Sequence, residues 1–206
     1  LHLTGIIVDK IRVLARNLND IPLGTIDGVE NSMDDLVDLK IMRSRTWIEE
    51  CRALLHDPSI SLSTEDLKEA FWRTMLCDRI DEGQRAPAEY SSYFSDYLEF
   101  LDSIQDSNYD RPPESFLLPI ESVEASIANS TSRRFCISDG GRMGQMPRGA
   151  EIGDLICVLN GGRVPFVLRE TGHDKFSFVG ECYVHGIMHG EAMEGNNDLK
   201  REFTIL

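Results

Sequence analysis

The sequence predicts an α+β fold, in which a helical N-terminal two-thirds packs on a small, glycine-rich antiparallel β-barrel or sandwich. Up to about residue 130, apolar residues mostly recur at three- and four-residue steps, which is the period of a helix. Beyond that point, β-branched and aromatic runs alternate with turns, and 11 of the 16 glycines lie between Gly140 and Gly190. We therefore divide the chain into a mainly helical region, 1–130, and a β-module, 131–206.

The first residues depart from the helical pattern. Apolar and polar residues alternate from Leu1, and a β-branched run ends at Val8, so this segment is expected to be a strand. At Asp9 the chain is expected to turn into a short helix, with Ile11, Leu14 and Leu18 on one side. Because the other predicted strands all lie at the far end of the chain, the N-terminal strand is predicted to pair with the β-module.

Four further helices are predicted. The first follows the candidate N-cap Ser32 and ends at about residues 56–58, and the second begins at Ser63, which has the spacing of a capping box with Asp66. A third, aromatic-rich helix follows Pro87, and packing in the core explains its tyrosines better than a stacking surface does. The last, short helix carries three apolar residues at helical spacing: Ile120, Val123 and Ile127.

The strands of the β-module are predicted from glycine turns and apolar runs. They cover residues 134–138, 142–145, 154–159, 163–169, 175–185 and 202–206. Asn160-Gly161 predicts a type I′ hairpin, and Gly180 predicts a bulge in the long fifth strand.

The charge distribution excludes some classes of partner. The net charge is −14, and residues 19–126 hold 24 acidic against 9 basic residues. An acidic surface repels phosphate backbones, so we expect no nucleic-acid partner. No apolar run approaches the roughly 20 residues of a membrane helix, so we expect no membrane partner and a cytoplasmic location. The start at Leu1, with neither a basic segment nor a cleavage site after it, suggests a piece of a longer chain.

Possible metal or nucleophilic chemistry centres on the cysteines and histidines. The chain has five widely spaced cysteines and no Cys-x-x-Cys, which favours reduced, buried thiols. Cys182, His185 and His189 have zinc-like spacing. On a strand, however, Cys182 and His185 point to opposite faces, so one buried thiol and two loop histidines explain them better. We therefore predict no catalytic residue, no metal and no cofactor.

A set of charged residues interrupts the apolar strands of the β-module. They are either an ion-paired network that specifies the fold or a recognition surface for a peptide or another domain. We name this set the predicted rim: Arg142, Arg163, Arg169, Glu181 and His185.

Several runs of the chain resemble a known family. They are residues 153–159, 161–169, 178–188 and 190–192, together with Arg133-Arg134-Phe135 and, upstream, Phe71-Trp72-Arg73-Thr74. This ordered set is similar to the C-terminal region of fungal heterokaryon incompatibility (HET) domain proteins. It is densest from Arg133 to Ala192, and it departs from the family at His189, where an acidic residue is more usual.

The resemblance implies a cytosolic fungal protein of non-self recognition, in which the fusion of incompatible cells triggers programmed cell death. The HET domain itself lies N-terminal to this region, and its tryptophan-glycine start is not found here. The leading hypothesis is therefore a non-enzymatic accessory or regulatory module that holds a HET domain inactive or senses a partner. The partner would be the HET domain of the same chain or another protein. The alternatives are a metal-assisted enzyme using Cys182, His185 and His189, and a purely structural stabiliser.

Overall fold

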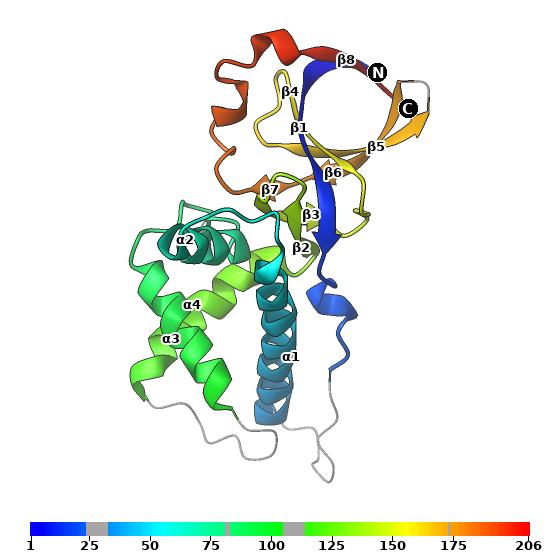
Figure 1. Cartoon of the computed structure of the whole chain (residues 1–206). Helices are drawn as coiled ribbons and strands as arrows, with labels where there is room; N and C mark the ends of the chain where they lie inside the picture. Colours follow the sequence, from blue (N-terminus) through cyan, green and yellow to red (C-terminus); the bar gives the residue numbers. More distant parts are fainter. Residues whose placement is uncertain (24–32, 81–82, 105–113, 173) are drawn as a thin grey trace.

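The computed structural model describes residues 1–23, 33–80, 83–104, 114–172 and 174–206, and it confirms the α+β fold. Helices gather at one end of the molecule and strands at the other (Figure 1). The helices are α1 (Met33–Ala53), α2 (Thr64–Met75), α3 (Tyr90–Ser103) and α4 (Glu114–Ile127). The strands are β1 (His2–Leu14), β2 (Arg133–Ser138), β3 (Met143–Pro147), β4 (Leu155–Leu159), β5 (Phe166–Gly172), β6 (Lys175–Glu181), β7 (Tyr183–Val184) and β8 (Arg201–Ile205).

The strands form one eight-stranded sheet in the order β4-β5-β6-β8-β1-β2-β3-β7, with an additional pairing of β4 and β1. The hydrogen-bonded neighbours β1, β4, β5, β6 and β8 therefore follow one another around a ring, which Figure 1 shows nearly end-on. The ring is weakest between β6 and β8, which are joined at two residue pairs. This pairing is parallel, so the prediction of a purely antiparallel module is corrected to a mixed sheet.

Strand β1 pairs with strands of the β-module, as predicted, but it is longer than expected. The predicted helix after Asp9 is wrong, because the strand continues to Leu14 through register shifts at Ile7/Asp9 and Ile11/Val13. Its first half pairs with β8 and β4, and its second half pairs with β2. The Asp9 side chain, at the first of these register shifts, joins β1 to the end of β2 by accepting hydrogen bonds from the Ser138 hydroxyl (2.7 Å) and the Gly140 amide (3.1 Å).

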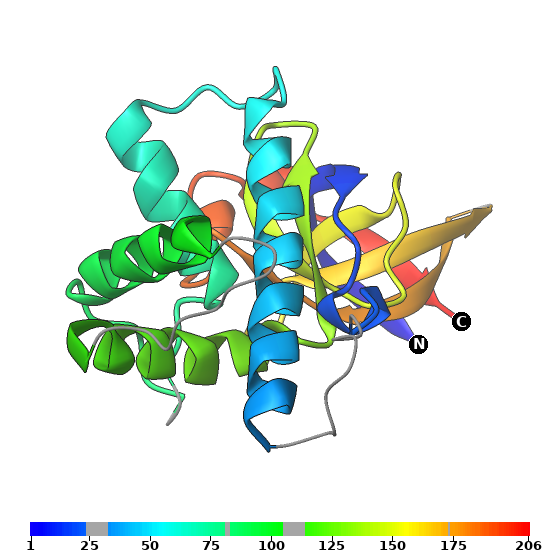
Figure 2. The same ribbon diagram turned by 90° about the horizontal axis from the view of Figure 1, so that it is seen from below.

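The helices share a hydrophobic core with the strands β2 and β3. In Figure 2, α2–α4 lie to one side of α1 and the strands to the other. The Phe71 ring of α2 makes edge contacts with Phe94 of α3 and Phe135 of β2, at centroid distances of 5.8 and 5.7 Å. The predicted inward residues of α4, which are Ile120, Val123 and Ile127, are all buried. The division of the chain at residue 130 stays a prediction, because this core crosses it.

The ends of several elements differ from the predictions. Helix α2 begins after Ser63, whose hydroxyl accepts the Asp66 amide as predicted, but it ends at Met75 instead of near Ile80. Helix α3 starts at Tyr90, so Pro87 precedes it by three residues. The predicted cap Ser32 of α1 lies outside the described residues. None of the described helices is long and apolar enough to cross a membrane.

Two predictions about turns in the β-module have different outcomes. Between β4 and β5 only Gly161 has a positive φ (85°), whereas a type I′ turn needs two such residues, so that prediction is wrong. The chain instead forms a loop from Asn160 to Pro165. The bulge at Gly180 is confirmed by a register shift against β5. The predicted long strand 175–185 divides after it into β6 and β7, and β7 pairs with β3.

Candidate functional site

A groove lies where the helical part meets the strand ring. Three hollows with volumes of about 180, 280 and 270 Å³ share the lining residues Val164 and Met188. The groove is bounded by residues 77–79, 83 and 85 after α2, the loop between β4 and β5, and residues of the segment 181–193. We call it the junction groove. Residues far apart in the sequence thus surround three adjoining hollows, and concave positions of this kind are where ligand sites usually lie.

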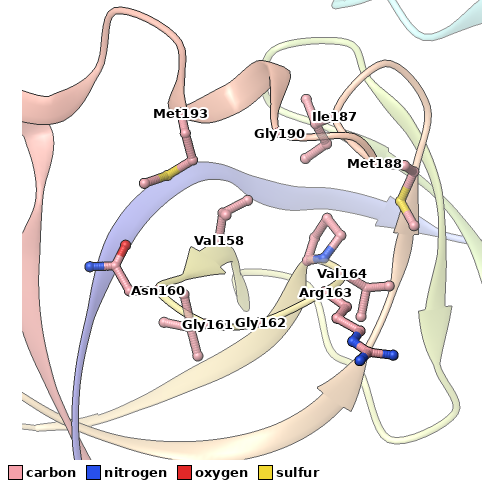
Figure 3. A pocket seen from close by; sticks show the side chains of 12 residues that line it. Val158, Asn160, Gly161, Gly162, Arg163, Val164, Ile187, Met188, Gly190 and Met193 are labelled. Atoms are coloured by element: carbon pink, nitrogen blue, oxygen red, sulfur yellow. The ribbon is translucent and has the colours of Figure 1, made fainter.

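One end of the junction groove is apolar. Figure 3 shows Ile187, Met188 and Met193 on one side, with Val158 of β4 and Val164 of the loop after it opposite. Methionine side chains are flexible and polarisable, so they adapt to apolar groups of different shape. This end of the groove is therefore suited to an aliphatic side chain of a partner.

The other end is basic. Arg79, Arg85, Arg133 and Arg163 line it, and His189 lies at its edge. Arg133 donates a hydrogen bond to the backbone carbonyl of Glu181 at 2.8 Å. Within the described part of the chain, neither Arg79 nor Arg163 forms an ion pair with a carboxylate. Among the described residues, the lining of this end holds more guanidinium than carboxylate groups, although the chain has a net charge of −14, and such a positive lining attracts negatively charged groups.

Asp78 stabilises one wall of the basic end and is one of the two carboxylate residues in the described part of its lining. The Asp78 carboxylate pairs with Arg73 of α2, and both side chains are about a tenth exposed (11% and 12%). It also accepts a hydrogen bond from Arg85 Nε at 2.8 Å, and Arg73 binds Glu69 at 2.6 Å. Asp78 is therefore neutralised by its own partners, and Glu181 is the second carboxylate residue of the lining.

The backbone at this wall is strained. Cys77 and Asp78 have φ values of 53° and 52°, in the left-handed region that non-glycine residues rarely adopt. The surrounding bonds stabilise the conformation, since the Asp78 amide donates to the Arg73 carbonyl (2.6 Å) and its carbonyl accepts from the Ala86 amide (3.0 Å). Such strain clusters at functional sites and persists where the neighbouring structure over-determines it.

Three further polar side chains lie close together beside the groove. The Tyr183 ring lines the groove, and its hydroxyl lies 3.3 Å from His185 Nδ1. Burial lowers the pKa of His185 and raises that of Tyr183. Gln145 pairs with Tyr183 across β3 and β7, and its buried amide has no hydrogen-bond partner in the parts of the chain described.

The residues of the predicted rim do not form one surface network. Arg163 and Glu181 line the junction groove, whereas Arg142 and His185 line another hollow beside Gly140 and Gly141. Pairing within this set was one of the two expectations, and Arg169 departs from it because its carboxylate partners, Asp154 and Glu151, lie outside the set.

Arg169 stabilises the strand ring by joining β5 to the loop before β4. It donates to both carboxylate oxygens of Asp154 (2.8 and 2.9 Å), to Glu151 (2.8 Å) and to the Gly149 carbonyl (2.8 Å). The side chain of Asp154 is 3% exposed. These bonds hold the loop before β4 against β5, so Arg169 is not an available recognition group.

The possible metal ligands are not brought together. Over the residues with described positions, no group of three or more His, Cys, Asp and Glu side chains is placed to hold a metal ion. Cys182 is buried between β6 and β7, and burial raises the pKa of its thiol well above the usual range. The His189 amide donates to the Glu191 carboxylate at 2.7 Å, which fixes this turn.

The chain is an α+β protein in which the helical part and the strand ring both contribute residues to the junction groove. Residues 119–206 match the family model of the Het-6 β-barrel domain. This match confirms the resemblance of the chain to the C-terminal region of fungal heterokaryon incompatibility-type proteins. A search of curated proteins and a search of solved structures gave no match. Strand β1 lies outside the matched range, although it pairs with β4 and β8 and completes the ring.

The sequence singled out Arg163 but not Arg79 and Arg133, the arginines that line the same groove. The signal that was available is local: the turn at Gly83 is flanked by Arg79 and Arg85 within a strongly acidic region. Nothing in the sequence places this turn beside the loop between β4 and β5.

Proposed function

We propose that this region is a regulatory, partner-recognising module of a heterokaryon incompatibility protein, and that it recognises its partner through the junction groove. The partner is the HET domain of the same chain or another protein of the cytoplasm, and recognition controls programmed cell death. The observation that carries this proposal is the groove itself, whose Arg79 and Arg163 guanidinium groups lack an ion-pair partner among the described residues.

The chemistry of the groove supports recognition better than catalysis. Arginine side chains stay protonated at any physiological pH, so they bind anions but do not act as general bases. Burial raises the pKa of the Cys77 and Cys182 thiols, which keeps them protonated and poor nucleophiles. The groove thus offers fixed positive charge and apolar surface, which are the properties of a binding site.

The position of the groove supports a regulatory role. Its basic end combines Arg79 from the helical part with Arg133 and Arg163 from the β-module. An occupant that contacts both parts adds its binding free energy to the stability of their junction. Such a module responds to the presence or absence of its partner.

The proposal is tested in the complete protein, expressed in a fungal host, with cell death scored by a vital dye in the presence and absence of the incompatible partner strain. The variant Arg79→Glu/Arg163→Glu reverses two charges of the groove. The matched control Lys68→Glu/Lys200→Glu changes the net charge equally at exposed positions outside the groove.

We expect the groove variant to lose the dependence of cell death on the partner strain, while the control keeps it. If both variants respond to the partner strain as the unmodified protein does, the groove has no part in recognition. If deletion of residues 1–206 leaves the response unchanged, the regulatory role itself is wrong.

A further inference from the structure

We propose that the junction groove binds an acidic peptide segment that carries an aliphatic side chain next to its carboxylates. This inference rests on the proposed function and names the chemistry of the partner.

The order of residues along the groove carries the inference. The apolar end is lined by Val158, Ile187, Met188 and Met193, and the basic end by Arg79 and Arg133. Arg163 and Val164 stand where the two ends meet (Figure 3). A ligand that fills both ends must present an apolar group beside negative charge, within the reach of a few side chains.

Carboxylates suit the basic end. Guanidinium groups form bidentate, charge-assisted hydrogen bonds with carboxylates. Arg79 and Arg163 are both exposed, and no described carboxylate is paired with either. Because Asp78 is already bonded to Arg73 and Arg85, it does not compete for them. An incoming carboxylate therefore meets guanidinium groups that no carboxylate of the described residues neutralises.

The lining of the groove favours a peptide over a nucleotide. A nucleotide base is usually held by stacking on an exposed aromatic ring. Among the described residues of the lining, Tyr183 supplies the aromatic ring, and it is 6% exposed. The methionines and valines of the apolar end offer instead an adaptable surface for Leu, Ile or Val side chains.

The test is fluorescence polarisation on the purified 206-residue chain at low salt. The probe is a fluorescein-labelled peptide of sequence Ser-Glu-Asp-Leu-Ile-Asp-Glu-Ser. A second peptide replaces Leu and Ile by Ser, a third replaces the four acidic residues by Lys, and unlabelled tripolyphosphate serves as a competitor that carries charge alone.

We expect the first peptide to bind about tenfold or more tightly than either of the other two, since each lacks one half of the complementarity. Arg79→Glu/Arg163→Glu should weaken binding by about tenfold or more. Met188→Ala should weaken the first peptide by several-fold and leave the serine peptide unchanged. The control Lys68→Glu/Lys200→Glu should stay within about twofold. Tripolyphosphate should compete weakly.

Equal binding of the first two peptides would show that the apolar end is not used, and would overturn the inference. Affinity that is insensitive to the arginine reversals would overturn it as well, as would tripolyphosphate competing as well as the first peptide. Where the reversal variant fails to fold by circular dichroism, Arg79→Gln/Arg163→Gln provides the same comparison with less repulsion. If peptide binding fails while the arginine variants still abolish the response in cells, the proposed function stands and the ligand class is wrong.

Discussion

Asp78 is the residue whose removal should damage the junction groove most, and replacement by alanine measures its contribution. The Asp78–Arg73 pair is about nine-tenths buried, and breaking a buried pair costs about 3–5 kcal/mol. The lower end applies because Arg73 keeps its bond to Glu69. Alanine also lacks the short polar side chain that makes φ of 52° tolerable, which adds about 1 kcal/mol. Asp78→Ala should therefore lower the free energy of unfolding by about 4 kcal/mol.

Two companion variants separate the parts of this effect. Asp78→Asn keeps the tolerance for the left-handed backbone and one acceptor oxygen, so it should cost about 2 kcal/mol. The Arg85 side chain is 65% exposed, so its ion pair with Asp78 is weak. Arg85→Ala should therefore lower the free energy of unfolding by less than about 1 kcal/mol.

The assay is urea unfolding at pH 7, followed by the fluorescence of the two buried tryptophans, Trp47 and Trp72. The reasoning is refuted if Asp78→Ala costs less than about 1 kcal/mol, or if Arg85→Ala costs as much as Asp78→Ala.

Three further predictions concern the helical core and the barrel. Arg169→Ala should lower the free energy of urea unfolding by about 3 kcal/mol, because it leaves the buried Asp154 carboxylate without its ion pair. Glu151→Ala should cost less than about 1 kcal/mol, because the Glu151 side chain is 67% exposed. Equal losses for the two variants would contradict this. Burial raises the pKa of Glu124, which accepts the Tyr97 hydroxyl, so its contribution to stability is complete below the unfolded pKa of about 4.3 and is lost as the pH rises through the folded pKa. Glu124→Gln should therefore flatten the fall in melting temperature above pH 4.3 or so, and an unchanged slope would argue against a buried carboxylate. A fragment of residues 119–206 should fail to unfold cooperatively and should recover on addition of a peptide of residues 1–16, since β1 pairs with β4 and β8. A fragment that folds alone would contradict the role given to β1.

The elements that the sequence predicted well are those whose signals are local. Ser63 caps α2 because its hydroxyl and the Asp66 amide are three residues apart, and this needs no distant partner. The buried face of α4 follows from the spacing of Ile120, Val123 and Ile127 alone. The glycine turn after Ser138 is likewise a local feature.

The errors arose where distant strands decide the conformation. Ile11 and Leu14 fit one side of a helix, but Ile11, Arg12 and Val13 also alternate in the way that a strand does. Pairing with β2 and β4 selects the strand, and that pairing is not visible locally. Arg169 was assigned to a rim because its partner Asp154 lies on the neighbouring side of a hairpin whose register the sequence does not specify.

The candidate site shows the same limit. Arg163 could be singled out because it follows a glycine turn within an apolar segment. Its proximity to Arg79 depends on how the segment after α2 packs against the ring, and this is a tertiary contact between residues about eighty positions apart.

A charge-swap measurement tests most directly the claim that the junction groove recognises an acidic partner. The lysine-substituted peptide described above is titrated into the unmodified chain and into the Arg79→Glu/Arg163→Glu variant. We predict that the variant binds this peptide about tenfold or more tightly than the unmodified chain, while the Lys68→Glu/Lys200→Glu control gains no more than about twofold. If the control gains as much as the groove variant, the peptide senses net charge alone, and the groove is not the recognition surface.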